Sequence, residues 1–203
     1  MTPREIIKEA RYIFLDTDTA SLRQSDEELL LYVNGALKEA SHLAPNLFFT
    51  TGDFTCEHGK TEQIATFDDA QTLFDVIRIK DGNYVQAMDW DFMNRFVPEW
   101  QTLPEGAALN WTRTAGDPLR FYIYPKSPVN QVLEVLYVKN PDEYTLDQPI
   151  TELPPASKPA LANYVIYRAE SKDDEFVNNA RALAFYNLFS TYFRPAAPQQ
   201  QGA

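Results

Sequence analysis

Apolar residues recur every three or four positions at both ends of the chain, which is the spacing of amphipathic helices. In residues 1–45, Thr2 with Glu5 and Ser25 with Glu28 have the spacing of helix N-terminal capping boxes, and Pro3 suits a first helical turn. The sequence therefore predicts two helices joined by a polar loop. Their apolar stripes are Ile6, Ile7, Ala10, Ile13 and Phe14 in the first helix, and Leu29, Tyr32, Val33, Ala36, Leu37 and Ala40 in the second.

Residues 153–193 have the same helical period and predict a second pair of helices. Pro155 and Pro159 lie early in the first of these helices, and Ser171 with Asp174 resembles a weak cap for the second. Helices this short are marginal alone in water, so the two pairs are predicted to pack together as a small helical bundle. The last helix is rich in apolar residues, with Phe176, Ala180, Leu183, Phe185, Phe189 and Phe193.

Between residues 46 and 152 the period changes from 3.6 to 2, which indicates strands. Two hairpins are expected, one around residues 57–60 and one around Asp81-Gly82. A short helical turn is expected at residues 89–96, and further strands at residues 110–114, 120–124 and 131–138. The predicted class is α+β, with an antiparallel β-sandwich or barrel-like domain inserted into a helical bundle. The predicted domains are 1–45 and 153–193 for the bundle, 46–152 for the β domain and 194–203 for an extended tail.

The chain has 203 residues, with 18 basic and 29 acidic side chains and a net charge of −11. Segment 46–152 holds 8 basic and 17 acidic residues, so the excess acid is expected in the β domain. A chain with this excess of acidic residues is not expected to wrap nucleic acid, because phosphate binding needs clustered Lys and Arg. The first helix begins at residue 2 and no apolar run approaches the roughly 20 residues of a membrane span, so neither a signal peptide nor a membrane segment is expected.

Candidate chemistry is sparse. Cys56 and His58 could share a strand face as metal ligands or as nucleophile and base, but two such residues rarely make a site. Asp16 with Asp18, and Asp89 with Asp91, are possible carboxylate pairs, although Asp89 is better read as a helix cap. The sequence has no glycine-rich phosphate loop, nucleophile elbow or HExxH motif. No catalytic, cofactor or metal site is predicted, and the tryptophans are expected to be core or interface anchors: Trp90, Trp100 and Trp111.

Four segments resemble bacteriophage head-to-tail adaptor proteins, the connector or neck components of tailed phages. They are TPREIIKEAR at the start, SDEELLLYVNGALKEASHLAP, EVLYVKNPDEYTLDQPITELP and ALANYVIYRAESKDDEFVNNARA. The most specific part of the resemblance is the YRAESKDDEF stretch of the last segment. The resemblance implies a structural virion protein without catalysis, made in the host cytoplasm and assembled as a dodecameric ring. It also implies contacts with the portal protein and with a tail nozzle or tail-tube protein, while DNA passes through the lumen without specific binding.

Two surfaces follow from this resemblance. The surplus aromatic residues of the last helix are expected at a subunit or portal interface: Phe185, Tyr186, Phe189, Tyr192 and Phe193. The polar, proline-rich end is expected to dock on the portal through Arg194, Pro195, Pro198, Gln199, Gln200 and Gln201. Acidic residues of the middle domain are a candidate lining of the channel. Two other functions stay open, a virion carbohydrate- or receptor-binding module that uses the tryptophans and a metal-dependent hydrolase that uses the aspartate pairs.

Overall fold

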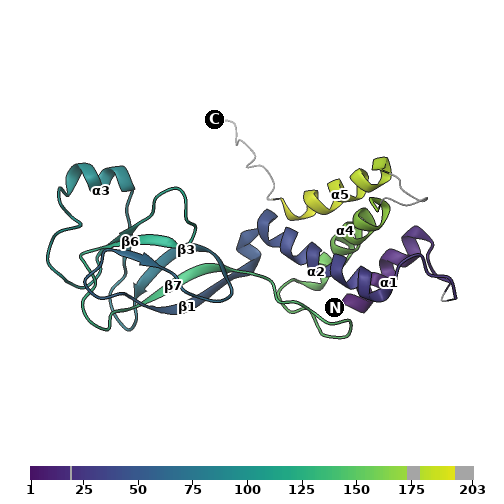
Figure 1. Cartoon of the computed structure of the whole chain (residues 1–203), viewed down its shortest axis with the longest axis horizontal. Coiled ribbons are helices and arrows are strands. Elements are labelled where there is room, and N and C mark those ends of the chain that lie inside the picture. Colours follow the sequence, from purple (N-terminus) through teal and green to yellow (C-terminus); the bar gives the residue numbers. More distant parts are fainter. Residues whose placement is uncertain (19, 173–178, 195–203) are drawn as a thin grey trace, which may run out of the picture. The chain divides into compact units, whose positions relative to one another are not determined.

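The computed structural model describes residues 1–18, 20–172 and 179–194. The chain divides into two compact units, a helical unit of residues 1–48 and 141–203 and a β unit of residues 49–140. Figure 1 shows the helices and strands that belong to each unit. The α+β class is confirmed. The second boundary falls at residue 140, whereas the sequence placed it at 152.

The first two helices begin at the predicted caps. Helix α1, Pro3–Phe14, has a complete capping box, in which the Thr2 side chain accepts from the Glu5 amide and the Glu5 carboxylate accepts from the Thr2 amide. Helix α2, Asp26–Leu43, begins at Ser25, whose hydroxyl accepts from the Glu28 amide at 3.2 Å. A short 3-10 turn, Pro45–Phe48, follows α2.

Helix α4 is the central element of the helical unit. It spans Lys158–Glu170 after a 3-10 turn at Pro155–Ser157, and it contacts α1, α2 and the last helix, α5, Asn179–Phe193. Its predicted apolar stripe is completely buried, with Leu161, Val165, Ile166 and Ala169 all at 0% exposure. Asp174 and Phe176 lie outside the described residues.

The segment between the β unit and α4 is held by polar contacts to α1 and α2. Arg4 binds both carboxylate oxygens of Asp147, at 2.6 and 2.9 Å. Asn34 makes a reciprocal pair with the Tyr144 backbone, donating to its carbonyl at 3.1 Å and accepting from its amide at 3.0 Å. Lys38 pairs with Glu143 at 2.8 Å. These contacts explain why residues 141–152 belong to the helical unit.

A buried arginine organises the loop between α1 and α2. Arg11 is 8% exposed and donates to the Asp16 carboxylate at 2.5 Å, the Asp26 carboxylate at 2.8 Å and the Gln24 carbonyl at 2.8 Å. A buried guanidinium is tolerated only when its donors are paired, so this loop depends on the three partners.

The β unit contains two sheets. One has the order β1-β7-β3, with β1 at Phe49–Thr55, β7 at Val132–Lys139 and β3 at Ala70–Ile79. The other has the order β2-β6-β5-β4, with β2 at Glu62–Ile64, β6 at Arg120–Tyr124, β5 at Asn110–Thr112 and β4 at Gln86–Ala87. Neither sheet closes into a barrel, so the barrel-like expectation is wrong. The more specific arrangement of a sandwich inserted in a bundle stays a prediction.

Both sheets contribute to one hydrophobic core. Phe54 of β1 meets Phe121 of β6 edge to face, with ring centroids 5.4 Å apart, and Leu73, Val135 and Ile123 have no exposed surface. Helix α3, Trp90–Phe96, begins where Asp89 caps the Phe92 amide, as the sequence predicted. A core shared by all the longer strands gives residues 49–140 the means to fold as a unit.

The first hairpin prediction is wrong, and the second is confirmed only next to its turn. The strands on either side of residues 57–60 do not pair with each other, because the Cys56 amide bonds the Gln131 carbonyl in one sheet and the Thr61 carbonyl accepts from Ile123 in the other. At Asp81-Gly82 the chain does form a short hairpin, in which Asp81 has φ 57°, the Ile79 amide donates to the Asn83 carbonyl at 2.9 Å and the Val85 amide donates to the Ile77 carbonyl at 3.2 Å. The following strand, β4, then joins the other sheet parallel to β5, so that sheet is mixed rather than antiparallel.

With the boundary at residue 140, the acidic residues divide differently between the two units. The helical unit has 10 basic and 16 acidic residues, and the β unit has 8 basic and 13 acidic residues. The expected concentration of acid in the β domain is therefore wrong, because the acidic segment 141–152 belongs to the helical unit.

Candidate assembly surface

The inner face of α5 is an aromatic contact with α4. Phe189 is 0% exposed and lies 4.9 Å from the Tyr164 ring, and Phe193 is 4% exposed and 5.0 Å from Phe189. Tyr186 packs 5.0 Å from Tyr167 and donates its hydroxyl to Glu39 of α2 at 2.7 Å. This hydrogen bond, with partial burial, raises the pKa of Tyr186 to about 12. Helices α4 and α2 therefore hold α5 in place.

The outer face of α5 exposes apolar side chains. Leu183, Leu188 and Tyr192 are 59%, 57% and 47% exposed, and Asn187 and Thr191 are the exposed polar residues near them. The α5 sequence has one charged residue, Arg181, which donates to the Ile13 carbonyl at 3.0 Å and lies 3.7 Å from the Glu170 carboxylate. We call Leu183, Asn187, Leu188, Thr191 and Tyr192 the α5 outer face. These five residues carry no charge, and Arg181, seven residues before Leu188, lies on the same side of the helix one turn or more toward its start.

The predicted interface residues divide between these two faces. Tyr192 is exposed, Phe185 and Tyr186 are half-buried, and Phe189 and Phe193 are buried inside the helical unit. The sequence reasoning omitted Leu183 and Leu188 from the interface because it favoured aromatic residues. Leu188 precedes Tyr192 by four residues and therefore lies on the same side of the helix, and this spacing was the signal that could have found it.

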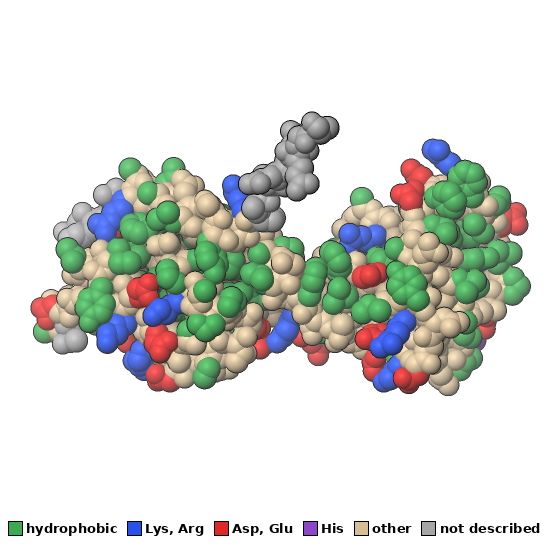
Figure 2. Space-filling view, turned by 180° about the vertical axis from the view of Figure 1, so that it is seen from behind, with side chains coloured by type: hydrophobic (Ala, Val, Ile, Leu, Met, Phe, Trp, Pro, Cys, Tyr) green, Lys and Arg blue, Asp and Glu red, His purple; other side chains and the backbone are tan. Residues whose placement is uncertain are grey.

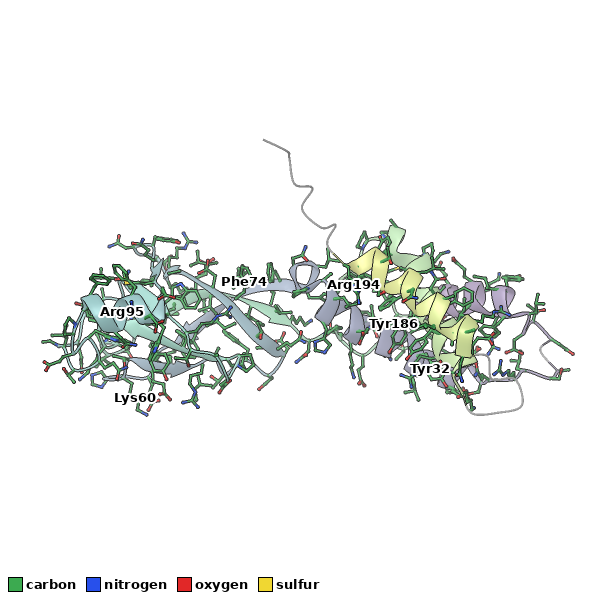
Figure 3. The ribbon with its side chains drawn as sticks, turned by 90° about the horizontal axis from the view of Figure 1, so that it is seen from above. Tyr32, Lys60, Phe74, Arg95, Tyr186 and Arg194 are labelled. Atoms are coloured by element: carbon green, nitrogen blue, oxygen red, sulfur yellow. The ribbon has the colours of Figure 1, made fainter. Side chains whose placement is uncertain are left out.

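Of the predicted docking tail, only Arg194 can be placed. It is exposed just beyond the end of α5, where its amide donates to the Ser190 carbonyl at 2.9 Å (Figure 3). Pro195, Pro198, Gln199, Gln200 and Gln201 lie outside the described residues.

The β unit has its own exposed apolar side chains. Phe92 and Phe96 of α3 are 46% and 67% exposed, with ring centroids 4.4 Å apart. Figure 2 shows hydrophobic side chains gathered at the end of the β unit that carries α3. The tryptophans do not form an exposed platform, since Trp100 and Trp111 are 2% and 6% exposed and Trp90 packs on Trp100 and Tyr122.

The candidate chemical residues have structural partners. Cys56 is buried, which raises the pKa of its thiol, and His58 contacts the Glu105 carboxylate at 3.1 Å. Asp16 pairs with Arg11, and Asp18 accepts hydrogen bonds from the Ala20 amide and the Ser21 hydroxyl, which lower its pKa. Among the described residues, no three His, Cys, Asp or Glu side chains form a group that could hold a metal ion. No helix in this part of the chain is long and apolar enough to cross a membrane.

Comparison with known proteins supports the adaptor resemblance. No curated protein matches the chain. The family model described as SU10 adaptor protein matches residues 1–203. This match covers the four segments that resemble head-to-tail adaptors, so that resemblance is confirmed. The family is one of structural proteins rather than enzymes. The chain therefore belongs to the SU10 adaptor protein family, a family of phage head-to-tail adaptors and hence of virion components.

Proposed function

We propose that this adaptor assembles as a dodecameric ring that joins the portal protein to the tail and surrounds the DNA exit channel. Its partners are then further copies of the chain, the portal protein and a tail nozzle or tail-tube protein. The family match supports the position between head and tail. The net charge of −11 suits a channel through which DNA passes without specific binding, because both units repel phosphate.

The α5 outer face is the observation that carries the proposal. A ring needs two different, complementary surfaces on each subunit, because cyclic assemblies other than dimers use heterologous contacts. Interface centres are depleted of charge and enriched in apolar and aromatic residues, and the residues of this face are uncharged and include two leucines and one tyrosine. Leu183, Leu188 and Tyr192 supply the exposed contact area, flanked by the half-buried Phe185 and Tyr186. Phe189 and Phe193 support the face from beneath by fixing α5 on α4.

The chain end is proposed to be a second contact with the portal. Arg194 follows the last residue of α5 and is exposed, so its cationic side chain can contact a partner surface. The nine residues that follow contain two prolines and three glutamines and only alanines as other apolar side chains. Such a composition cannot form a core of its own and suits a segment that orders against a partner.

Electron microscopy of the full-length protein mixed with the portal ring of the same phage tests this function. We expect a second ring stacked coaxially on the portal. Leu188→Glu should prevent it, since a charge would then have to be buried in the contact. Leu31→Glu is the matched control, because Leu31 is 70% exposed on α2 and is not part of the α5 outer face.

A truncation that ends at Phe193 tests the chain end separately, and it should weaken or abolish docking while the helical unit stays folded. A bare portal in the presence of the full-length protein would contradict the adaptor ring. Equal assembly of the two glutamate variants would contradict the role of α5.

A further inference from the structure

An apolar groove of about 320 Å³ lies in the helical unit, between α1 and the loop that leads to α2. Its lining includes the buried Ile7 and the exposed Tyr12 and Leu22, and we call it the α1 groove. Ile13 and Leu15, at the end of α1, are also exposed, at 40% and 85%. Among the described residues of the helical unit outside α5, most exposed large apolar side chains are therefore gathered at this end of α1. Such a gathering marks an interaction surface.

The charges that line the α1 groove are mostly paired inside the subunit. Arg11 binds the carboxylates of Asp16 and Asp26. Arg4 binds Asp147 at 2.6 Å and lies 3.7 Å from the Asp26 carboxylate. A partner can therefore displace water from the groove without leaving these charges unpaired, provided that it brings no charge of its own.

The α1 groove and the α5 outer face turn away from α4 on different flanks of the helical unit. Glu9 of α1 faces α4 through its ion pair with Lys158 at 3.2 Å. Arg4, Lys8 and Arg11 are spaced by four and three residues, so they share the side of α1 that lines the groove, away from Glu9. The inner side of α5 packs on α4, and Figure 1 shows α4 between α1 and α5. Contacts around a ring require two such separate surfaces on each subunit.

The α5 outer face matches the groove in charge and in size. Its five residues are uncharged, and the single charged residue of α5, Arg181, is already paired within its own subunit. Leu188 and Tyr192 lie one turn apart and expose apolar surface. The groove is at the small end of the roughly 300–1,000 Å³ of ligand pockets, which suits a few side chains. Lys8 is exposed at the rim, where its ammonium group can stay in water while its stem covers the contact.

We propose that the α5 outer face of one copy docks in the α1 groove of the next copy, with Leu188 and Tyr192 packed against Tyr12 and Leu22. The inference rests on the proposed ring and names the second surface that its subunit contact needs. A contact between two different surfaces repeats in one direction and can close into a ring. A contact between two α5 outer faces would instead stop at a dimer.

Cysteine cross-linking between full-length copies tests this contact. The single native cysteine, Cys56, is buried and does not compete with introduced thiols. Leu188→Cys and Leu22→Cys variants are mixed with the portal ring and oxidised. We expect a cross-linked dimer from the mixture and none from either variant alone. A chain with both substitutions should give a ladder of cross-linked oligomers that ends at the closed ring.

Matched variants show whether the cross-link reports the groove. Leu31→Cys mixed with Leu188→Cys is the control and should not cross-link, because Leu31 is exposed on α2 and does not line the groove. Leu22→Glu should raise the protein concentration needed for ring assembly about tenfold or more, and Leu31→Glu should leave it unchanged. If Leu22→Cys fails to fold, Tyr12→Cys takes its place.

Rings on the portal in which Leu188→Cys cross-links with itself, or with Leu31→Cys as readily as with Leu22→Cys, would overturn the proposal and leave the adaptor ring standing. Rings without any cross-link would do the same. A cross-linked ladder from protein that leaves the portal bare would support the contact and reject the portal adaptor.

Discussion

The helical unit and the β unit differ in which parts of the chain they are built from. The β unit comes from one continuous segment, residues 49–140, around a single core. The helical unit joins the two ends of the chain, and polar contacts such as Arg4 with Asp147 and Tyr186 with Glu39 connect residues more than a hundred positions apart. The β unit can therefore complete its contacts within one continuous segment, whereas the helical unit needs both ends of the chain.

Truncating a core side chain in each unit should give the largest loss of stability and so the clearest test of this difference. Phe121→Ala in the β unit and Phe189→Ala in the helical unit should each cost about 3–5 kcal/mol, because both side chains are completely buried. Trp90, Trp100 and Trp111 all belong to the β unit, so tryptophan fluorescence reports its unfolding. Far-ultraviolet circular dichroism mainly reports the four long helices of the helical unit.

The two variants should act on different signals. Phe121→Ala should move the fluorescence transition in urea and leave the dichroism transition in place, and Phe189→Ala should do the reverse. Transitions that move together in both variants would show that the units unfold as one, and the comparison would be wrong.

Removing the partner of a buried charge should give the next largest loss of stability. Asp16→Ala leaves one donor of the buried Arg11 unpaired and should destabilise the helical unit by about 1.5–3 kcal/mol, with Asp26 and the Gln24 carbonyl limiting the loss. Asp18→Ala is the control, because Asp18 is exposed in the same loop, and its effect should be smaller. Equal shifts of the dichroism transition in the two variants would rule out a special role for the Arg11 network.

The contact between α2 and segment 141–152 tests how much a link between distant parts of the chain stabilises the helical unit. Asn34→Ala removes both hydrogen bonds to the Tyr144 backbone and should cost about 1–2 kcal/mol. Asn34→Asp keeps the acceptor for the Tyr144 amide and should cost less. Faster hydrogen exchange at the Tyr144 amide should accompany the alanine variant, and an unchanged rate would argue against this contact.

Tyrosine ionisation should give the smallest effect. The pKa of Tyr186 is raised to about 12, above its ordinary value near 10, because the neutral hydroxyl donates to Glu39. The folded state then binds this proton more tightly than the unfolded state, so the stabilisation is complete below pH 10 and is lost as the pH rises to about 12. Tyr186→Phe should make the dichroism midpoint less sensitive to pH over this range. A pH dependence identical to that of the unmodified chain would exclude Tyr186 as the titrating group.

Features set by neighbouring residues could be predicted from the sequence. The capping box of Thr2 and Glu5, the Asp89 cap and the strand at residues 120–124 are local, and the structure contains all three. The failed predictions concern partner choice. Cys56 and Thr61 are close in sequence, yet their backbones bond Gln131 and Ile123 in different sheets. Spacing along the chain contains no information on such distant partners.

The same limit affects the candidate surfaces. Helical spacing identified α5 as a surface rich in aromatic residues, but only the packing on Tyr164 shows that Phe189 faces inward and Leu188 outward. The boundary at residue 140 was missed because segment 141–152 has no periodic pattern and is held by side chains of α1 and α2.

The pairing of Phe49 with Val138 means that the chain begins and leaves the β unit at adjacent positions on neighbouring strands. Genetic exchange of everything between them would therefore leave the two flanking ends of the helical unit at nearly the same separation. A phage lineage could therefore replace this segment with a different domain while retaining the helical unit. The same junction is a practical place to insert a fluorescent or affinity label, provided that the ends of the insert also lie about 5 Å apart, the usual distance between paired antiparallel residues.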